Sequence, residues 1–224
     1  MSIIEHILRI ITPYDCLGCG DEGALMCKRC ASQHLEKLPE RCYRCYRLTP
    51  GSITCQTCRQ HSVLKAVYVR SSYTSLARDV IHKLKFNYAR DAAKLIAVEI
   101  YRVLPSLPDN MVITHVPAVT THIRQRGFDQ SALIARELSK LTGLPHINAL
   151  ARLGQVRQVG ANSSTRRSQL QGVFRPLSKS AYAGLPVLLI DDVTTTGSTI
   201  ELAGLCLRQA GAASVSAAAF AQAK

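Results

Sequence analysis

The sequence predicts an α/β protein with a mostly parallel β-sheet flanked by helices, preceded by a small cysteine-rich module. Two observations support this fold class. From about Lys65 onward, strand-like apolar runs alternate with segments of helical periodicity, the pattern of a parallel sheet covered on both faces. Before that point, eight of the nine cysteines fall within residues 16–58. We therefore expect two domains, residues 1–64 and residues 65–224.

The composition of the 224 residues is that of an ordinary globular protein, with 47% hydrophobic and 19% charged residues. Twenty-eight Lys and Arg residues against 15 Asp and Glu residues give a formal charge of +13, which favours a polyanionic partner. No run approaches the roughly 18 consecutive apolar residues that cross a bilayer. We therefore expect a protein that does not span a membrane.

The first 15 residues carry apolar side chains at helical spacing, interrupted by Glu5, His6 and Arg9. These polar residues deny the segment the uninterrupted apolar centre of a signal peptide. We expect a helix packed on the body of the protein, with a membrane-surface helix as the alternative. The expected location is the cytoplasm, with peripheral association at the inner membrane as the alternative. In that reducing compartment the cysteines need a role other than disulfides.

The cysteines before residue 60 form four C-x2-C pairs. They are Cys16/Cys19, Cys27/Cys30, Cys42/Cys45 and Cys55/Cys58. Both sulfurs of such a pair can face one ion, and two pairs complete a tetrahedral site of four cysteines. We expect two structural zinc ions in a double zinc-ribbon module whose folding is coupled to metal binding. One zinc ion with a degenerate second half, or an iron–sulfur cluster, is the alternative.

The spacing leaves open whether the pairs combine in sequence or interleave. The partner of this module is also left open. Zinc ribbons often bind nucleic acid, but the basic residues here are offset by acidic ones, so contact with DNA and docking on a protein are equally compatible with the sequence.

The second domain is expected to contain strands and helices in alternation. Short apolar runs predict strands at residues 65–69, 111–116, 187–190 and 214–220. Apolar residues at helical spacing predict helices at residues 76–84, 91–104, 129–141 and 199–210. Ligands of such sheets bind beyond the carboxyl ends of the strands. The seven histidines form no pair at metal-ligand spacing, so we expect the predicted metal to depend on cysteines alone.

One strand end is especially informative, because Asp191 and Asp192 follow the apolar run that ends at Ile190. Paired carboxylates can accept hydrogen bonds from two neighbouring hydroxyls of a sugar. The next small residues are Thr194, Thr195, Thr196, Gly197, Ser198 and Thr199. They lead into a helix, whose N–H groups and dipole favour a phosphate. The sequence thus predicts a ribose site beside a site for its 5-phosphate.

Residues 187–199 resemble the signature of type I phosphoribosyltransferases, which bind phosphoribosyl pyrophosphate (PRPP). The resemblance implies that Asp191 and Asp192 are the catalytic pair that holds the ribose hydroxyls, and that residues 194–199 hold the 5-phosphate. It also implies magnesium, carried mainly by oxygens of PRPP. Catalysis would depend on positioning and on charges that hold the leaving pyrophosphate, rather than on a protein nucleophile.

Further segments resemble the ComF family of bacteria, which includes GntX-like proteins. They are residues 73–86, residues 115–130, and residues 152–158 with Arg166 and Phe174. In that family a zinc module precedes a phosphoribosyltransferase domain, which matches this chain from about Ile7 to its end. The family is linked to natural transformation by imported single-stranded DNA and to the use of DNA as a nutrient. Asp129 and Gln169 depart from the family, which usually has Asn at both positions.

Several basic residues are candidates for binding pyrophosphate or DNA phosphate. They are Lys85, Arg124, Arg126, Arg166 and Arg167. Arginine suits this task because its planar fork can donate two hydrogen bonds to one phosphate. For each of these residues, a solvated surface charge is the alternative.

Three functions remain open at this point. The first is a ComF-type protein of DNA uptake that binds PRPP with magnesium and single-stranded DNA, with other DNA-uptake or recombination proteins as further partners. The second is a nucleotide-salvage phosphoribosyltransferase acting on a nucleobase-like acceptor, and the third is a binding module built on a retired enzyme scaffold. The resemblance implies an enzyme of pentosyl transfer, whose acceptor the sequence does not identify.

Overall fold

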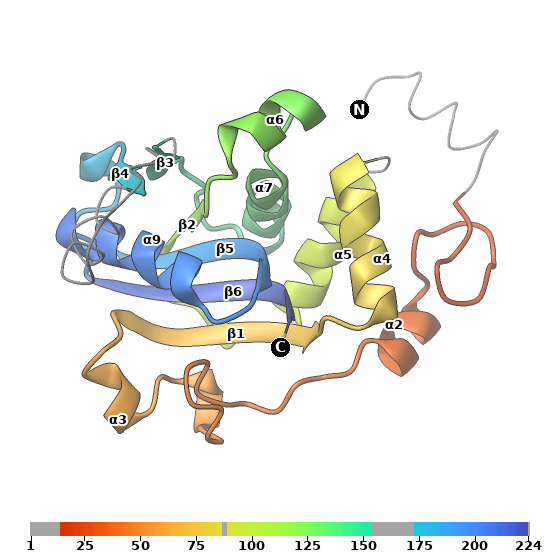
Figure 1. Ribbon diagram of the computed structural model, residues 1–224, viewed down its shortest axis with the longest axis horizontal. Coiled ribbons are helices and arrows are strands. Elements are labelled where there is room, and N and C mark those ends of the chain that lie inside the picture. The colour runs from red at the N-terminus through yellow and green to blue at the C-terminus, as the bar shows by residue number, and fades with distance from the viewer. Residues whose placement is uncertain (1–13, 87–88, 154–172, 224) are drawn as a thin grey trace, which may run out of the picture.

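The computed structural model describes residues 14–86, 89–153 and 173–223. These residues form an α/β fold around a parallel sheet with the strand order β1-β6-β5-β2 (Figure 1). The strands are β1 (Leu64–Ser72), β6 (Ser214–Gln222), β5 (Pro186–Thr194) and β2 (Val112–His115). The predicted fold class is confirmed. The predicted N-terminal helix, Arg166, Arg167 and Gln169 lie outside the described residues.

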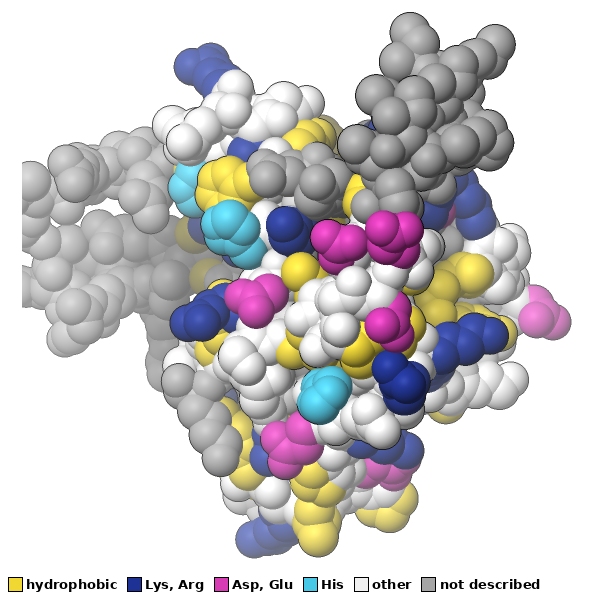
Figure 2. Space-filling view, turned by 90° about the vertical axis from the view of Figure 1, so that its right-hand side faces the viewer, with side chains coloured by type: hydrophobic (Ala, Val, Ile, Leu, Met, Phe, Trp, Pro, Cys, Tyr) yellow, Lys and Arg dark blue, Asp and Glu magenta, His cyan; other side chains and the backbone are white. Residues whose placement is uncertain are grey.

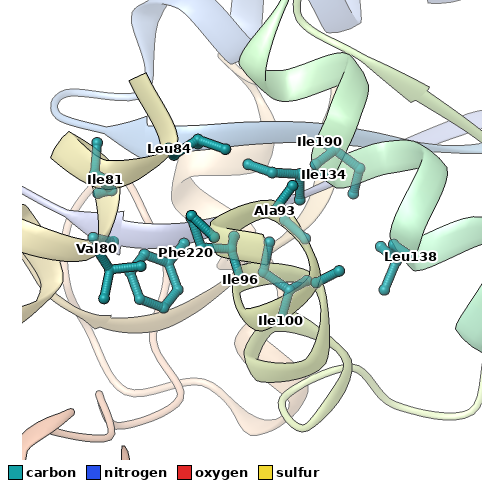
Figure 3. Packing of buried hydrophobic residues seen from close by; sticks show 14 of the residues in the cluster. Val80, Ile81, Leu84, Ala93, Ile96, Ile100, Ile134, Leu138, Ile190 and Phe220 are labelled. Atoms are coloured by element: carbon teal, nitrogen blue, oxygen red, sulfur yellow. The ribbon is translucent and has the colours of Figure 1, made fainter. Parts of the chain in front are cut away.

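Helices cover both faces of the sheet. One face carries α4 (Ser75–Phe86), α5 (Ala89–Tyr101) and α7 (Gln130–Thr142), and the other carries α9 (Ser198–Gln209) with the antiparallel pair β3 (Leu150–Arg152) and β4 (Phe174–Pro176). Strand residues alternate between the two faces, as the pleat requires. Leu188 and Ile190 pack with α4, α5 and α7, as Figure 3 shows for Ile190, whereas Val187 and Leu189 pack with α9.

The connections around the sheet are short helices and turns. They comprise α2 (Lys28–His34), α3 (Gln56–Arg59), α6 (Thr120–Arg126) and the 3-10 turns η1 (Pro50–Ser52) and η2 (Lys179–Ala181). The helix α6 ends at Gly127, whose φ of 80° closes the last turn. The helix α7 begins at Asp129, whose carboxylate accepts a hydrogen bond from the amide of Ala132.

The N-terminal residues cover the edge of the sheet. Isolated antiparallel bridges join Lys37 to Ser71 and Ile53 to Ala66, both on the outer side of β1. An edge strand with unpaired backbone groups is a site of aggregation, and covering it removes that hazard. The cysteine-rich segment therefore has a structural role beside any role in binding.

The cysteine-rich segment contains two modules, a first with Cys16 to Cys30 and a second with Cys42 to Cys58, and they attach to different layers of the fold. Cys16 and Cys30 of the first module belong to the apolar cluster of α4, α5 and α7. Nearby, buried Arg70 donates hydrogen bonds to Glu99 (2.7 Å) and to the carbonyl of Leu35 (3.1 Å). Tyr43 of the second module belongs to the cluster of α9. The two modules thus pack against opposite faces of the sheet.

The strand β5 is longer than the sequence suggests. We predicted its end at Ile190, but it continues to Thr194, because Asp191, Val193 and Thr194 pair in parallel register with β6. Backbone pairing does not depend on side-chain polarity, so the apolar run underestimates the strand. Asp191 and Asp192 therefore lie within the last residues of β5 and not in the loop that follows it.

No helix among the described residues is both long enough and apolar enough to cross a bilayer.

Replacing Ile96 by Ala should lower the free energy of unfolding by about 2–5 kcal/mol, because its buried side chain would leave a cavity between α5 and the sheet. Val98 lies on the same helix but is 36% exposed, so Val98→Ala serves as the control and should cost roughly 0.5 kcal/mol. Urea denaturation of both variants measures the difference. Equal costs would contradict this account of the core.

Candidate functional site

The candidate site lies at the carboxyl edge of the sheet, where β5 ends. The Asp191 carboxylate accepts hydrogen bonds from the hydroxyl of Ser131 on α7 (3.2 Å) and from the amide of Asp192 (3.0 Å). Burial, and next the charge of Asp192, raise the pKa of Asp191 well above its usual range. A ligand that donates hydrogen bonds or brings positive charge would therefore stabilise the ionised pair.

Asp192 is only 7% exposed, and one of its oxygens is unsatisfied. Its Oδ1 accepts a hydrogen bond from the amide of Val193 (2.9 Å). Its Oδ2 has no hydrogen-bond partner among the described residues, although Lys85 Nζ approaches it to 3.4 Å. A buried carboxylate oxygen without a hydrogen bond is costly, so this atom is suited to accept one from a ligand.

The predicted phosphate loop turns directly into α9. Gly197 has a φ of 80° and precedes the first helical residue, and the first backbone bond of the helix runs from the amide of Glu201 to the carbonyl of Gly197 (2.9 Å). The amides of residues 198–200 come before this first bond, so they have no carbonyl partner within the helix itself. The hydroxyls of Thr196 and Ser198 lie 2.7 Å apart, and both residues are exposed. Amides, hydroxyls and helix dipole thus favour an anion here.

Two of the predicted basic residues converge on this edge. Lys85, at the end of α4, lies beside Asp192, and the next residue, Phe86, has its ring centroid 5.8 Å from the guanidinium carbon of Arg126. Arg126 donates a hydrogen bond to Gln130 (3.1 Å), while its buried Nε has no partner among the described residues. Arg124 is exposed on α6. The ends of α4 and α6 therefore approach β5 with positive charge.

The sequence analysis missed a histidine pair near the same edge. His115 Nδ1 lies 3.2 Å from His146 Nε2, although the two residues are far apart in the chain. Burial lowers the pKa of both rings, that of His146 to about 4 with help from the charges of His115 and Arg136, so both are neutral at neutral pH. No local spacing could reveal this pair, because β2 and the segment after α7 meet only in the folded sheet.

Asp129 has a defined structural role where the ComF family usually has Asn. One oxygen caps α7 at the amide of Ala132 (3.1 Å), and the other accepts a hydrogen bond from the amide of Ala118 (2.8 Å). A carboxylate can accept both bonds, whereas an asparagine amide has only one accepting oxygen. Asp129 therefore fixes the loop before α6 to the start of α7.

The eight cysteines of the modules form two separate groups of four in sequence order. One group is Cys16, Cys19, Cys27 and Cys30, and the other is Cys42, Cys45, Cys55 and Cys58, with all sulfurs of a group within 4.8 Å of one another. Tetrahedral zinc with bonds near 2.3 Å needs sulfurs about 3.8 Å apart. The Cys19–Cys27 distance of 3.9 Å and the Cys45–Cys55 distance of 3.6 Å fit that geometry. The pairs do not interleave.

Backbone amides favour the thiolate form of one buried cysteine in each group, while burial and the neighbouring sulfurs raise the pKa of Cys30 and Cys58 to about 12. Burial opposes ionisation of Cys16, but hydrogen bonds from amides, that of Cys27 foremost, outweigh it and lower its pKa to about 6. Cys42 has the same balance, with amides of Cys45 and Cys55 lowering its pKa to about 6. Four sulfur donors with amide support are typical of closed structural sites, so each group is compatible with a structural zinc ion.

A second contact that the sequence analysis missed joins the group of Cys42, Cys45, Cys55 and Cys58 to the predicted phosphate loop. Tyr43 lies between the ligands Cys42 and Cys45, yet its hydroxyl donates a hydrogen bond to Glu201 in the first turn of α9. Burial, and next the Glu201 carboxylate, raise the pKa of the Tyr43 phenol, which therefore stays protonated as the donor. These residues are 158 positions apart, and no motif signals their contact.

Comparison with curated proteins gives relatives that align with different shares of the chain. Competence protein F of Haemophilus influenzae is 33% identical over 43% of this chain and 44% of its own length. Competence protein ComFC of Bacillus subtilis is 26% identical over 85% of this chain and 81% of its own length. DNA utilization protein YhgH of Salmonella typhimurium is 33% identical over 65% of this chain and 66% of its own length. The chain thus spans less than half of the first of these relatives.

No family model matches the sequence. Among solved structures, an allosteric regulatory enzyme of purine biosynthesis has a TM-score of 0.43 at 20% identity, covering 58% of this chain and 25% of its own. Adenine phosphoribosyltransferase from Thermoanaerobacter pseudethanolicus has a TM-score of 0.38 at 12% identity, covering 58% of this chain and 80% of its own. These scores are low, so the assignment depends on the sequence relatives, together with the paired cysteines. The chain belongs to the ComF family of competence protein F, ComFC and YhgH.

Proposed function

We propose that the protein acts in DNA uptake in the cytoplasm, binding PRPP with magnesium at the end of β5 and handling imported single-stranded DNA. The observation that carries the proposal is that two structural features lie side by side at the carboxyl edge of the sheet. Within the part of the chain that the structure describes, a buried carboxylate oxygen of Asp192 lacks a hydrogen bond, and the next turn opens the N-terminus of α9 with exposed hydroxyls. A ribose diol and a 5-phosphate match these two features.

In this proposal the unsatisfied Oδ2 of Asp192 and the Asp191 carboxylate accept hydrogen bonds from the ribose hydroxyls. The hydroxyl of Ser131 holds Asp191 in place from α7. Residues 194–199 hold the 5-phosphate through helix amides and through the hydroxyls of Thr196 and Ser198. Magnesium, when bound with PRPP, adds positive charge on its pyrophosphate oxygens.

Lys85 and Arg126 are the proposed partners of the leaving pyrophosphate. Lys85 Nζ is 3.4 Å from Asp192 without a ligand, so it can exchange that carboxylate for a phosphate oxygen when the ribose occupies Asp192. Arg126 has a buried Nε, without a partner among the described residues, close to the same helix end. Cations placed before the reaction stabilise the charge that develops as pyrophosphate leaves the anomeric carbon. Arg124 extends this positive surface.

The DNA part of the proposal is supported by the printed names of the relatives and by the charge of the chain. The words competence and DNA utilization stand in the names of relatives that align over most of this chain. With 28 basic residues against 15 acidic ones, and with no Trp and 4 Phe, binding should depend on phosphate charge more than on base stacking. Figure 2 shows interspersed charges of both signs on the side of α4, so that face offers no continuous positive stripe.

Asp191→Asn combined with Asp192→Asn should abolish PRPP binding in calorimetry, because amides cannot replace both anionic acceptors of a ribose diol. Single-stranded DNA binding should stay intact or strengthen, since two negative charges are lost. Asp109→Asn is the matched control, because Asp109 is exposed before β2, at the opposite end of the strands. PRPP binding retained by the double variant would refute the site. Pyrophosphate release with nucleobases as acceptors would favour the salvage enzyme instead.

Single-stranded DNA binding should be independent of sequence and should weaken at least tenfold between about 50 and 200 mM salt, if about three phosphates are neutralised. Arg124→Gln should flatten this salt dependence, because Arg124 is an exposed cation at the site edge. Lys140→Gln is the control, since Lys140 already pairs with Glu137 at 2.6 Å. Fluorescence anisotropy measures both. An affinity that does not change with salt would contradict the proposal.

Metal analysis should find two zinc ions per chain, one for each group of four cysteines. Cys45→Ser should lower the content to about one ion and lower the melting temperature, because metal binding and folding of such modules are coupled. Cys206→Ser lies outside both groups and should retain two ions. Iron in place of zinc, or one ion in the unmodified chain, would contradict the assignment.

A further inference from the structure

The second cysteine module touches the phosphate loop through the ring of Tyr43. Gly197 faces this ring so closely that a Cβ at Gly197 would lie 2.7 Å from Tyr43 Cδ2 and Cε2. Tyr43 itself is only 4% exposed. The ring therefore fixes the one loop residue whose positive φ starts α9, and no side chain larger than hydrogen fits between them.

The hydroxyl of Tyr43 reaches the same helix at Glu201. This carboxylate accepts hydrogen bonds from Tyr43, from the hydroxyl of Ser62 (2.9 Å) and from the amide of Val63 (2.7 Å). Ser62 Oγ also lies 2.8 Å from the Tyr43 hydroxyl. Glu201 is thus held by donors from the metal module and from the residues that connect it to β1.

This arrangement solves an electrostatic problem of the loop. Glu201 lies in the first turn of α9, at the helix end that favours a phosphate, and its negative charge opposes a second anion there. Three donors hold the carboxylate toward the metal module and stabilise its charge there. Without Tyr43, the glutamate loses one of its three donors and Gly197 loses the ring that packs against it.

The first module makes a different set of contacts. Its buried residues, among them Cys16, Leu25 and Cys30, pack in the cluster of α4, α5 and α7, whereas Tyr43 packs in the cluster of α9. The two groups of four cysteines therefore provide an internal comparison, because only the second is joined to α9 by Tyr43 among the described residues.

We propose that Tyr43 is a positioning residue of the phosphate loop, and that metal binding by Cys42, Cys45, Cys55 and Cys58 thereby controls affinity for phosphoribosyl ligands. The identity of the ligand rests on the proposed function above. The coupling between module and loop is a property of the ligand-free protein, so it can be measured separately.

The first test is hydrogen exchange of the ligand-free protein, monitored at the amides of residues 195–199. Tyr43→Phe removes the hydroxyl and keeps the ring. Exchange should become about 2- to 10-fold faster, because that ratio corresponds to the net free energy of one lost hydrogen bond. Tyr43→Ala also removes the ring and should have a larger effect. Tyr46→Phe is the matched control, since Tyr46 belongs to the same module and its ring is 42% exposed. Zinc content should remain at two ions in the Phe variants.

The second test compares the exposed ligands of the two groups, Cys45→Ser and Cys19→Ser. Loss of metal from the second group should speed loop exchange and raise the Kd for PRPP, whereas loss from the first should leave loop exchange as it was. Loop exchange that is unchanged in Tyr43→Ala and Cys45→Ser would overturn the coupling. If the unmodified protein does not bind PRPP, the proposed function fails, and the exchange rates alone still decide the coupling.

Discussion

The parallel pairing of β5 with β6 beyond the apolar core is the constraint on which the site depends. Because β6 continues to Gln222, β5 continues to Thr194, and its two aspartates are held by a backbone ladder. Their surroundings then follow from the helices at that edge: α7 supplies Ser131 and α4 supplies Lys85. A loop could not hold a buried Asp192 beside a half-buried Asp191 with the same restraint, since each carboxylate must keep its own neighbours.

Charge at this edge is balanced by contacts from distant segments. Asp192 lies against Lys85, while Glu201 receives its donors from Tyr43, Ser62 and Val63. The carboxylates nearest the predicted phosphate loop are thus held by contacts within the protein. In the proposed function, this preorganisation lowers the electrostatic cost of bringing in a phosphate, because the protein does not reorganise its own charges at that moment.

Local pattern was sufficient for much of the fold and for the positions of the candidate site. The apolar alternation predicted the parallel sheet, and the spacing of the cysteines predicted two groups of four. Contacts between distant segments were beyond that reasoning. The sequential grouping of the cysteines, the His115–His146 pair and the Tyr43–Glu201 bond depend on how folded elements meet. The length of β5 was missed for the same reason, since only its neighbour β6 extends it.

The strand order has a consequence for how the chain is made. The strand β1 is the first to be synthesised, and its neighbour in the sheet is β6, the last, with Leu64 opposite Val215. It must therefore wait for nearly the whole chain before it can join the sheet, and such long-range pairing is slow. The four cysteines of each group beside it are close in sequence, within residues 16–30 and 42–58, so each group can assemble before the sheet is complete. On the ribosome they can fold first and shield β1 through the bridges at Lys37 and Ile53 until its partner emerges.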